Sequence, residues 1–436
     1  LSVRLSYRSF KEVEIGFTRG YVSSQAYAEH FDNSEIEPAK RPLLYDTGAY
    51  QKKYRWLGAH ARRLVFYFLK EVEENPSLRL DMFAFDFDEP DIVRAIAHIG
   101  PRANLFLDDH DLGPKKLAKA AKLKQDAIDE LKDHDVKIKL GHFTRFQHNK
   151  VMIQIDGSGK PTKVLTGSAN FSLRGLYVQA NSVLVFDDDR VAALYEEAYR
   201  EAFNGVSKYK KSHIASRWHL VERNENTPAM WISFAPHEDA FTLDKVSDAI
   251  RSANSSVLFS IMGMGGGGPV IPSIKQLLGE DNIFSLGSTQ TSSGLELFRP
   301  GLDNNQAIVP YSYLKDKVPA PFRKEWSGGA GMSIHHKYVV CDFNDSMPVV
   351  FCGSSNLAEG GEKGNGDNLI AIYDKNIATL YAIEAIRLFD HYRFRSVQQT
   401  STANRPLVLA DSDKWVDRYY DPKNIKYLER SMLCKH

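Results

Sequence analysis

A run of polar and small residues occurs twice in this chain, and the repetition constrains the fold more than any other feature. The first copy spans residues 148–170 and the second spans residues 335–356. Each copy begins with His-x-Lys, continues through an apolar stretch to an Asp, and ends with Gly-Ser-x-Asn. The shared positions are His148, Lys150, Asp156, Ser168 and Asn170 in the first copy, and His335, Lys337, Asp342, Ser354 and Asn356 in the second.

The spacing indicates that the two copies are related by duplication. From His to Gly the first copy counts 19 positions and the second counts 18. The extra residue lies between His and Asp, because Asp156 follows His148 by eight positions whereas Asp342 follows His335 by seven. From Asp to Gly both copies count eleven, and beyond that point the offset stays at 186, which pairs Asn181 with Asp367.

The residue types in each copy suit the binding of a phosphodiester. His and Lys stand two positions apart on an expected strand, so their side chains point to the same face. Lys supplies a positive charge, while the Asn amide and the N–H and hydroxyl groups of the Gly-Ser turn can bond to anionic oxygens. Two histidines can divide a two-step displacement, one attacking phosphorus and the other transferring the proton.

At these residues the chain resembles the phospholipase D superfamily, over residues 78–204 and 239–391. One departure is that Ile155 stands where the family pattern has Asp, and Asp156 follows it. The resemblance implies a metal-free, cofactor-free phosphodiesterase that forms a covalent phosphohistidine. The predicted catalytic residues are His148, Lys150, Asn170, His335, Lys337 and Asn356. Supporting roles are expected for Ser168, Ser354, Asp342, Asp156, Asn181 and Asp367, with the family's Asp mainly a structural partner.

The difference between Asn181 and Asp367 predicts which histidine does what. A carboxylate beside a histidine stabilises the imidazolium and suits a general acid, whereas an amide carbonyl can fix the neutral tautomer. Taking each residue as the partner of the histidine in its own copy, we expect His148 to be the nucleophile and His335 to be the acid.

Strand and helix patterns alternate through both copies, which predicts an α/β fold. Each repeat is expected to be a mixed β-sheet flanked by helices on both faces, and the resemblance implies a pseudo-two-fold pair with the active site between the repeats. The predicted parts are an N-terminal extension and helix (1–77), the first repeat (78–204), a basic linker (205–238), the second repeat (239–391) with an insertion at 287–333, and a tail (392–436) whose aromatic residues pack on the body.

The predicted elements follow from periodicity and from turn residues. Helices are expected over 51–75, 89–99, 114–133, 190–203, 242–253 and 270–278. Strands are expected over 13–17, 78–87, 103–107, 136–140, 152–155, 163–166, 182–186, 256–262 and 283–286.

Composition narrows the remaining possibilities. The chain has 436 residues, 43% of them hydrophobic, which suffices for two domains. Its net charge of +1 means that any nucleic-acid contact needs local basic patches. The linker offers one such patch, whose members are Lys208, Lys210, Lys211 and Arg217. Its interleaved Tyr209 and Trp218 slightly favour contact with a single strand by stacking, although aromatic residues in a linker more often pack between domains. A second patch is the basic helix with Lys115, Lys116, Lys119, Lys122 and Lys124, for which an ordinary solvated face is an equally good explanation. Three cysteines without paired spacing argue against disulfides or zinc, and Lys150 and Lys337 would repel a metal ion.

The motifs recognise a phosphodiester but do not say what it joins. We favour a nuclease acting on DNA or RNA, because of the local basic stretches and the lack of a membrane or secretion signal, which also favours a cytoplasmic location. A phospholipase D or transphosphatidylase is the alternative, and the insertion at 287–333 could supply its apolar entrance. A non-catalytic nucleic-acid-binding module is the third possibility. Two half-sites in one chain make a monomer sufficient.

Overall fold

The computed structural model describes residues 6–7, 10–20, 24–112, 119–277, 282–290, 308–310, 334–399 and 412–433. Within them the chain forms two compact units, each made of segments that are distant in sequence. The first unit comprises residues 1–22, 35–242 and 352–371, and the second comprises 23–34, 243–351 and 372–436. The segment 352–371, which carries the Gly-Ser turn of the second copy, therefore belongs to the first unit.

The first sheet has eight strands in the order β1-β2-β8-β7-β6-β3-β4-β5. It is mixed, because β3, β4 and β5 run parallel to one another while the remaining pairs are antiparallel. The strands are β1 (Ser6–Tyr7), β2 (Val13–Phe17), β3 (Arg79–Ala84), β4 (Ala103–Leu107), β5 (Lys137–Leu140), β6 (Val151–Ile155), β7 (Pro161–Gly167) and β8 (Ser182–Phe186).

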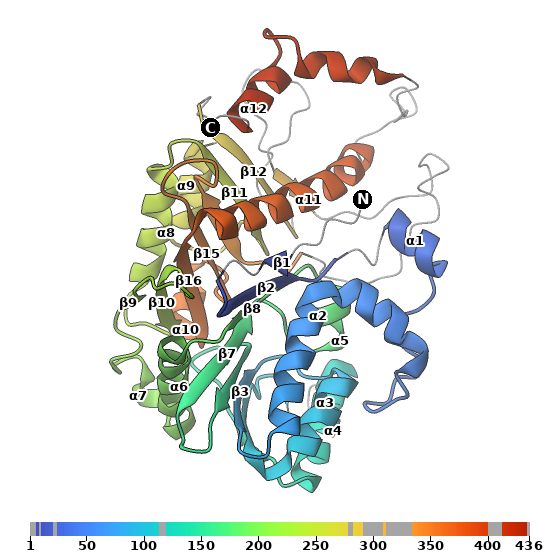
Figure 1. The fold of residues 1–436 in the computed structure, drawn as a ribbon, viewed down its shortest axis with the longest axis vertical. Helices are drawn as coiled ribbons and strands as arrows, with labels where there is room; N and C mark the ends of the chain where they lie inside the picture. Colours follow the sequence, from blue (N-terminus) through green and yellow to red (C-terminus); the bar gives the residue numbers. More distant parts are fainter. Residues whose placement is uncertain are drawn as a thin grey trace. The chain divides into compact units, whose positions relative to one another are not determined.

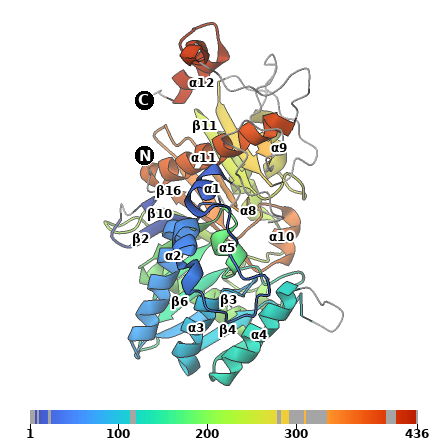
Figure 2. The ribbon, with the colours of Figure 1, turned by 90° about the vertical axis from the view of Figure 1, so that its right-hand side faces the viewer.

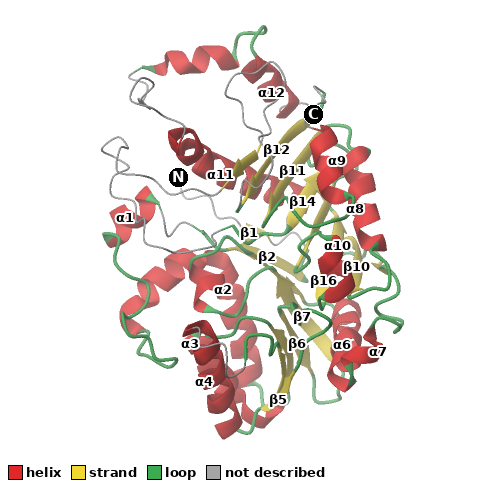
Figure 3. Cartoon of the chain, turned by 180° about the vertical axis from the view of Figure 1, so that it is seen from behind, coloured by secondary structure: helices red, strands yellow, loops and turns green. Residues whose placement is uncertain are grey.

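Helices cover both faces of this sheet (Figures 1 and 3). One face is covered by α2 (Gln51–Glu74), whose apolar stripe packs against β2 and β8. The other is covered by α6 (Asp189–Asn204), which packs against β3, β6 and β7 and begins where the Asp188 side chain accepts the Arg190 amide at 2.9 Å. The remaining helices of this unit are α3 (Pro90–Ile99), α4 (Lys119–Asp133), α5 (Leu173–Tyr177), α7 (Val206–Tyr209) and α10 (Glu359–Gly364), with 3₁₀ turns η1 (Gly48–Tyr50) and η2 (Gly100–Arg102).

Helices α2 and α5 run side by side in Figure 2. Their contact centres on Tyr54 and Tyr177, whose buried rings stack with centroids 4.0 Å apart. The Tyr177 hydroxyl also donates to Glu89, which accepts the amide of Ile92 at the start of α3. This apolar and polar packing fixes α5, the short helix that follows the first Gly-Ser turn.

The second sheet also has eight strands, in the order β13-β12-β11-β14-β15-β16-β10-β9. It is mixed, since β11, β12 and β13 are parallel and β14 is antiparallel to β11 and β15. The strands are β9 (His219–Val221), β10 (Ala229–Ala235), β11 (Ser256–Ile261), β12 (Phe284–Thr289), β13 (Ile308–Pro310), β14 (Tyr338–Cys341), β15 (Val349–Gly353) and β16 (Asp367–Tyr373). The second unit contains α1 (Gln25–Phe31), α8 (Phe241–Arg251, of which the last nine residues lie in this unit), α9 (Val270–Leu277), α11 (Lys375–Gln399), η4 (Asp413–Tyr419) and α12 (Ile425–Leu433).

The predicted fold class is confirmed: both sheets are mixed and flanked by helices, and the predicted elements are present with ends shifted by a few residues. Several elements were not predicted. They include β9 and β10, which lie in the expected linker, α10, whose Gly-rich sequence gives no helical signal, and β14, β15, β16 and α11 around the second copy of the motif. Residues 114–118 of the expected helix lie outside the described residues, as does most of the expected insertion, 291–307 and 311–333.

The expectation that the tail aromatics pack on the body is wrong for two of them. Trp415 is 53% exposed and Tyr420 is 63% exposed. The tail belongs to the second unit, where α12 contacts β12. Among the described residues, no helix combines the length and the apolar composition needed to cross a membrane.

Candidate active site

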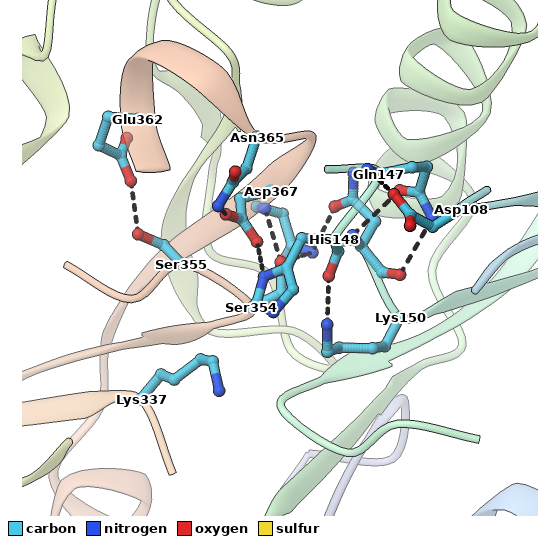
Figure 4. A network of polar contacts seen from close by, with 12 residues as sticks. Asp108, Gln147, His148, Lys150, Lys337, Ser354, Ser355, Glu362, Asn365 and Asp367 are labelled. Atoms are coloured by element: carbon cyan, nitrogen blue, oxygen red, sulfur yellow. Dashed lines mark hydrogen bonds and ion pairs between the residues drawn. The ribbon is translucent and has the colours of Figure 1, made fainter. Parts of the chain in front are cut away.

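The first His-x-Lys segment is anchored immediately before β6. The backbone amide of His148 donates to Gly366 O at 2.8 Å, and Gln147 pairs with Gly366 in an isolated bridge. The amide of Gln147 donates to Asp108 Oδ2 at 2.7 Å (Figure 4). This anchoring buries both side chains of the motif, with His148 6% exposed and Lys150 1% exposed.

His148 has a carboxylate partner from the second copy of the motif. Its Nδ1 lies 2.7 Å from Asp367 Oδ1, and both side chains are buried (Figure 4). We expected Asp367 to serve the histidine of its own copy, His335, and this expectation is wrong. The reason is the backbone, because β16 begins at Asp367 directly after the Gly366 that pairs with Gln147.

Lys150 is held beside His148 by its own strand and by an aromatic ring. Its ammonium group donates to His148 O and lies 5.1 Å from the ring centroid of Phe85. Burial lowers the pKa of Lys150 to about 8, opposed by the nearby carboxylates of Asp367, Asp86 and Asp108. The ammonium is therefore desolvated and loses its proton at a lower pH than an exposed lysine does.

The two Gly-Ser turns are built in the same way. Ser168 Oγ accepts the amide of Ser182 at 3.0 Å, and Ser354 Oγ accepts the amide of Asn368 at 3.0 Å, both across 14 residues. Each turn needs its glycine, because Gly167 and Gly353 have φ of +143° and +142° and an added Cβ would lie 2.2 and 2.4 Å from backbone oxygens. The two copies therefore share the same hydrogen bond and the same glycine conformation at this turn.

In both turns the side-chain oxygen of the asparagine is buried and accepts no hydrogen bond from the described residues. Asn170 donates its Nδ2 to Asp86 Oδ2 at 2.7 Å, while Asn170 Oδ1 and Asn356 Oδ1 have no hydrogen-bond partner among the described residues. Asn181, expected to face His148, instead accepts from Ser168 Oγ at 2.8 Å and donates to Gly175 O. It supports the turn rather than the histidine.

The second His-x-Lys segment precedes β14 and is equally buried, with His335 5% exposed and Lys337 1% exposed. The Lys337 ammonium lies 3.2 Å from His335 Nε2 and 2.9 Å from His335 O. The neighbouring His336 bonds to Glu384 on α11 at 3.1 Å, and burial lowers its pKa. His335 and Lys337 are thus adjacent in the second unit.

The two motif aspartates differ in their structural roles. Asp342 Oδ1 accepts the amides of Asn254 and Ser255 at 3.0 and 2.8 Å, which ties the end of β14 to the start of β11. Among the described residues, the Asp156 carboxylate accepts hydrogen bonds within its own turn, from Ser158 and Lys160, and none across the sheet. The one-residue shift in the first copy therefore coincides with a loss of the cross-strand tie.

The basic residues of the expected linker lie on its surface. Lys208, Lys211 and Arg217 are exposed and Lys210 is half-buried, and no contact recorded among the described residues links them to the motif residues. Tyr209 is buried and meets Phe143 edge to face at 5.0 Å, so it packs inside the unit rather than facing a ligand.

Several residues around His148 were missed by sequence reasoning. Phe85 and Asp86 follow β3, Asp108 follows β4 and Lys124, expected only as a member of a basic helix, lies on α4, all outside the duplicated pattern. Burial raises the pKa of Asp86, opposed by Lys124 and Lys150. The signal that could have found them is their position at the carboxyl ends of neighbouring parallel strands, where ligands bind in open α/β sheets.

The described residues include no cluster of three or more His, Cys, Asp or Glu side chains that could hold a metal ion. The described cysteines, Cys341 and Cys352, are buried, and burial raises the pKa of the Cys341 thiol.

Comparison with known proteins finds a similarity over part of the chain. Residues 74–202 match the family described as "Cardiolipin synthase, PLD-like domain". No curated protein matches the sequence.

Solved structures match over longer stretches at low identity. Phosphatidylserine synthase from Haemophilus influenzae matches with 10% identity and a TM-score of 0.51, over 86% of this chain and 91% of that one. Polyphosphate kinase from Porphyromonas gingivalis matches with 12% identity and a TM-score of 0.48, over 87% of this chain and only 53% of that one. The phospholipase D family member Nuc from Salmonella typhimurium matches with 20% identity and a TM-score of 0.26, over 33% of this chain and 87% of that one.

Proposed function

We propose that the chain is a phosphodiesterase that works through a covalent phosphohistidine on His148, a proposal supported by the match of residues 74–202 to a phospholipase D-like domain family. The observation that carries the proposal is the bond between His148 Nδ1 and Asp367. A carboxylate that accepts the Nδ1 proton leaves the lone pair on Nε2 available and stabilises the positive charge that attack places on the ring.

In the first step, His148 Nε2 attacks phosphorus and the bond to the leaving alkoxide breaks, while His335 supplies the proton to the leaving oxygen. In the second step, water attacks the phosphohistidine, His335 takes a proton from that water, and the P–N bond breaks to restore His148. The proposed role of His148 is the one expected, but the ground for it is different. A carboxylate partner was expected on the general acid, His335, and it lies on His148 instead. Here the carboxylate supports the nucleophile, because it offsets the positive charge that attack on phosphorus places on the ring.

The anionic oxygens need positive charge and hydrogen-bond donors throughout. Lys150 and Lys337 supply the charge, and the amides of Asn170 and Asn356 supply donors. In the free protein Lys337 lies 3.2 Å from His335 Nε2. A phosphate that draws this ammonium to its own oxygens leaves His335 Nε2 able to carry the proton for the leaving group.

We propose a nucleic acid as the substrate and no metal ion in the reaction. The two motif lysines take the place that a divalent cation would have beside the phosphate oxygens, and the exposed basic residues of 205–238 suit a polyanion. A second candidate is a phospholipid phosphodiester, which is favoured by the match to the cardiolipin synthase domain family.

The experiment is hydrolysis in EDTA of single-stranded DNA, duplex DNA, RNA, and vesicles of phosphatidylcholine or phosphatidylglycerol. His148→Ala is tested beside His134→Ala, a control at an exposed histidine that directly follows α4. Cleavage by the wild type and the control but not by His148→Ala is the expected result. No turnover of any diester would refute the phosphodiesterase, and turnover of vesicles alone would select the second candidate.

A further inference from the structure

The half-buried ring of Phe85 brings together the proposed nucleophile and two cations. Its centroid lies 5.0 Å from the ring of His148, which it meets edge to face, and 5.1 Å from the Lys150 ammonium. The ammonium of Lys124 lies 5.5 Å from the same centroid. An aromatic surface flanked by positive charge therefore adjoins the histidine, although neither Phe85 nor Lys124 belongs to the duplicated motif.

Lys124 has an unusual environment for a lysine. It is 3% exposed, and its ammonium has no hydrogen-bond partner among the described residues. The nearest carboxylate oxygen, Asp108 Oδ1, is 4.0 Å away. A buried ammonium without hydrogen bonds destabilises the folded protein. Its presence here is explained if a bound ligand accepts its hydrogens.

The charge of Lys124 acts on two buried carboxylates, because it opposes the burial that raises the pKa of Asp86 and of Asp108, but Lys124 hydrogen-bonds to neither. Asp108 already accepts the amides of Gln147 at 2.7 Å and His110 at 3.0 Å. Charge-assisted bonds between an ammonium and a carboxylate are normally about 2.7–2.9 Å long. At 4.0 Å Lys124 is too far from Asp108 for such a bond, and an incoming anion could take its hydrogens.

A second aromatic group extends the surface away from His148. The half-buried ring of Phe146 meets Phe85 at 5.6 Å and the exposed His110 ring at 4.6 Å. The exposed guanidinium of Arg145 lies 5.6 Å from the Phe146 centroid. Rings that alternate with cations are typical of sites for single-stranded nucleic acid, where bases stack and phosphates meet basic side chains.

We propose that Phe85 and Lys124 form a subsite for the nucleotide next to the scissile phosphate, with the base stacked on Phe85 and the adjoining phosphate bonded to Lys124. The inference rests on the proposed phosphodiesterase function and deepens it by naming single-stranded nucleic acid as the substrate. A phospholipid with one phosphate would leave Lys124 without an anion and would offer Phe85 no base to stack on.

The test compares a substrate that has neighbouring nucleotides with one that has none. Hydrolysis of a single-stranded oligothymidylate and of bis(p-nitrophenyl) phosphate is measured for the wild type, Lys124→Gln, Lys124→Arg, Phe85→Leu and Lys122→Gln. Lys122 is exposed on the same helix and serves as the matched control. We expect Lys124→Gln to lower kcat/KM on the oligonucleotide at least tenfold, mostly through KM, with a several-fold smaller loss on the small diester, and Lys124→Arg to recover most of it.

Salt dependence separates the two residues. Lys124→Gln should make the dependence of log kcat/KM on log salt shallower by roughly 0.7, the value for one phosphate contact on a single strand. Phe85→Leu should weaken oligonucleotide binding without changing that slope, because stacking releases no counterions.

Equal losses on both substrates, or an oligonucleotide loss no larger than that of Lys122→Gln, would overturn the subsite. If the wild type cleaves the small diester or phospholipid vesicles but no oligonucleotide, the subsite proposal fails while the phosphodiesterase stands. If the wild type cleaves none of them, the proposed function itself fails.

Discussion

Both carboxylate oxygens of Asp367 form hydrogen bonds. Oδ1 bonds to His148 Nδ1 at 2.7 Å, and Oδ2 accepts from Asn365 Nδ2 at 3.2 Å. This fixes the plane of the carboxylate, and through it the tautomer and orientation of the His148 ring. A buried pair held in this way leaves the ring little freedom to rotate away from a substrate.

Replacing this carboxylate should therefore damage the reaction more than the fold. We expect Asp367→Asn to lower kcat by at least about a hundredfold, because the amide cannot stabilise the cationic ring, while KM changes little. The measurement is steady-state hydrolysis together with the yield of acid-labile phosphoprotein. Asp187→Asn, at an exposed carboxylate, is the control, and an active Asp367→Asn enzyme would exclude the proposed role.

The pKa of Lys150, lowered to about 8, gives the reaction an alkaline limit. The charged form of Lys150 is needed for the phosphate and is lost as the pH rises through about 8, so kcat/KM should fall there. Lys150→Arg keeps its charge at high pH and should move the limit upward by more than about one pH unit, even if its maximal rate is lower. Lys163→Arg, on a lysine paired with Glu71 and Asp187, should leave the limit in place. An unmoved limit in Lys150→Arg would assign it to another group.

At the scale of elements, the contact between α6 and β3 contains a buried acid. Glu196 of α6 is 6% exposed, and burial, reinforced by Asp81 of β3, raises its pKa to about 8. Its exposed partner Arg200 lies 3.7 Å away and compensates only in part. The folded protein thus holds a proton on Glu196 that the unfolded chain releases near pH 4.5, where glutamate ordinarily titrates.

The sign of the resulting pH dependence follows from this difference. The folded state binds more protons than the unfolded state between about pH 4.5 and 8, so stability falls as the pH rises across that range. We expect the free energy of unfolding of Glu196→Gln to exceed that of the wild type by about 1 kcal/mol at pH 9 and to be nearly equal to it at pH 5. Urea unfolding at both pH values measures this, with Glu197→Gln on the same helix as control. A Gln variant with no relative gain at pH 9 would contradict it.

Sequence reasoning found the elements of the first repeat more completely than those of the second, and it found part of the candidate site. Strands such as Ala103–Leu107 and Ser182–Phe186 were predicted to the residue, because short apolar runs between turn signals suffice to define them. Strand β10 was missed because its apolar run follows the polar stretch 222–227, which reads as a linker. Asp86 and Asp108 were not predicted, because the sequence alone does not show that β3 and β4 pair in parallel and bring their carboxyl ends to His148.

At the scale of the whole molecule, sequence order and spatial grouping differ. Residues 352–371 belong to the first unit, where Asn368 accepts from Thr166 at 3.3 Å and from Tyr195 at 3.2 Å, and donates to Asn149 at 3.0 Å. Glu362 likewise bonds to Ser355 at 2.5 Å and to Thr242, and lies 3.4 Å from His237. These buried polar groups need one another to be satisfied.

A fragment of residues 1–242 should therefore fold poorly by itself. It lacks the segment that satisfies Asn149, Thr166 and His148, and buried polar groups left without partners destabilise a fold. We expect it to give a non-cooperative thermal transition, and the addition of 352–371 through a flexible linker to restore cooperativity. Calorimetry of both fragments is the check. A cooperative transition in 1–242 alone would show that the segment is dispensable.

The bond between His148 and Asp367 joins residues that are 219 positions apart and come from different copies of the duplicated unit. The two copies cannot change independently at these positions, because replacing Asp367 removes the hydrogen-bond partner of His148, and replacing His148 leaves Asp367 buried without it. Exchange of segments with a distant relative is constrained in the same way, since a single crossover anywhere between them would separate the ring from the carboxylate that evolved with it. A change at either of these two positions therefore has to be matched by a change at the other.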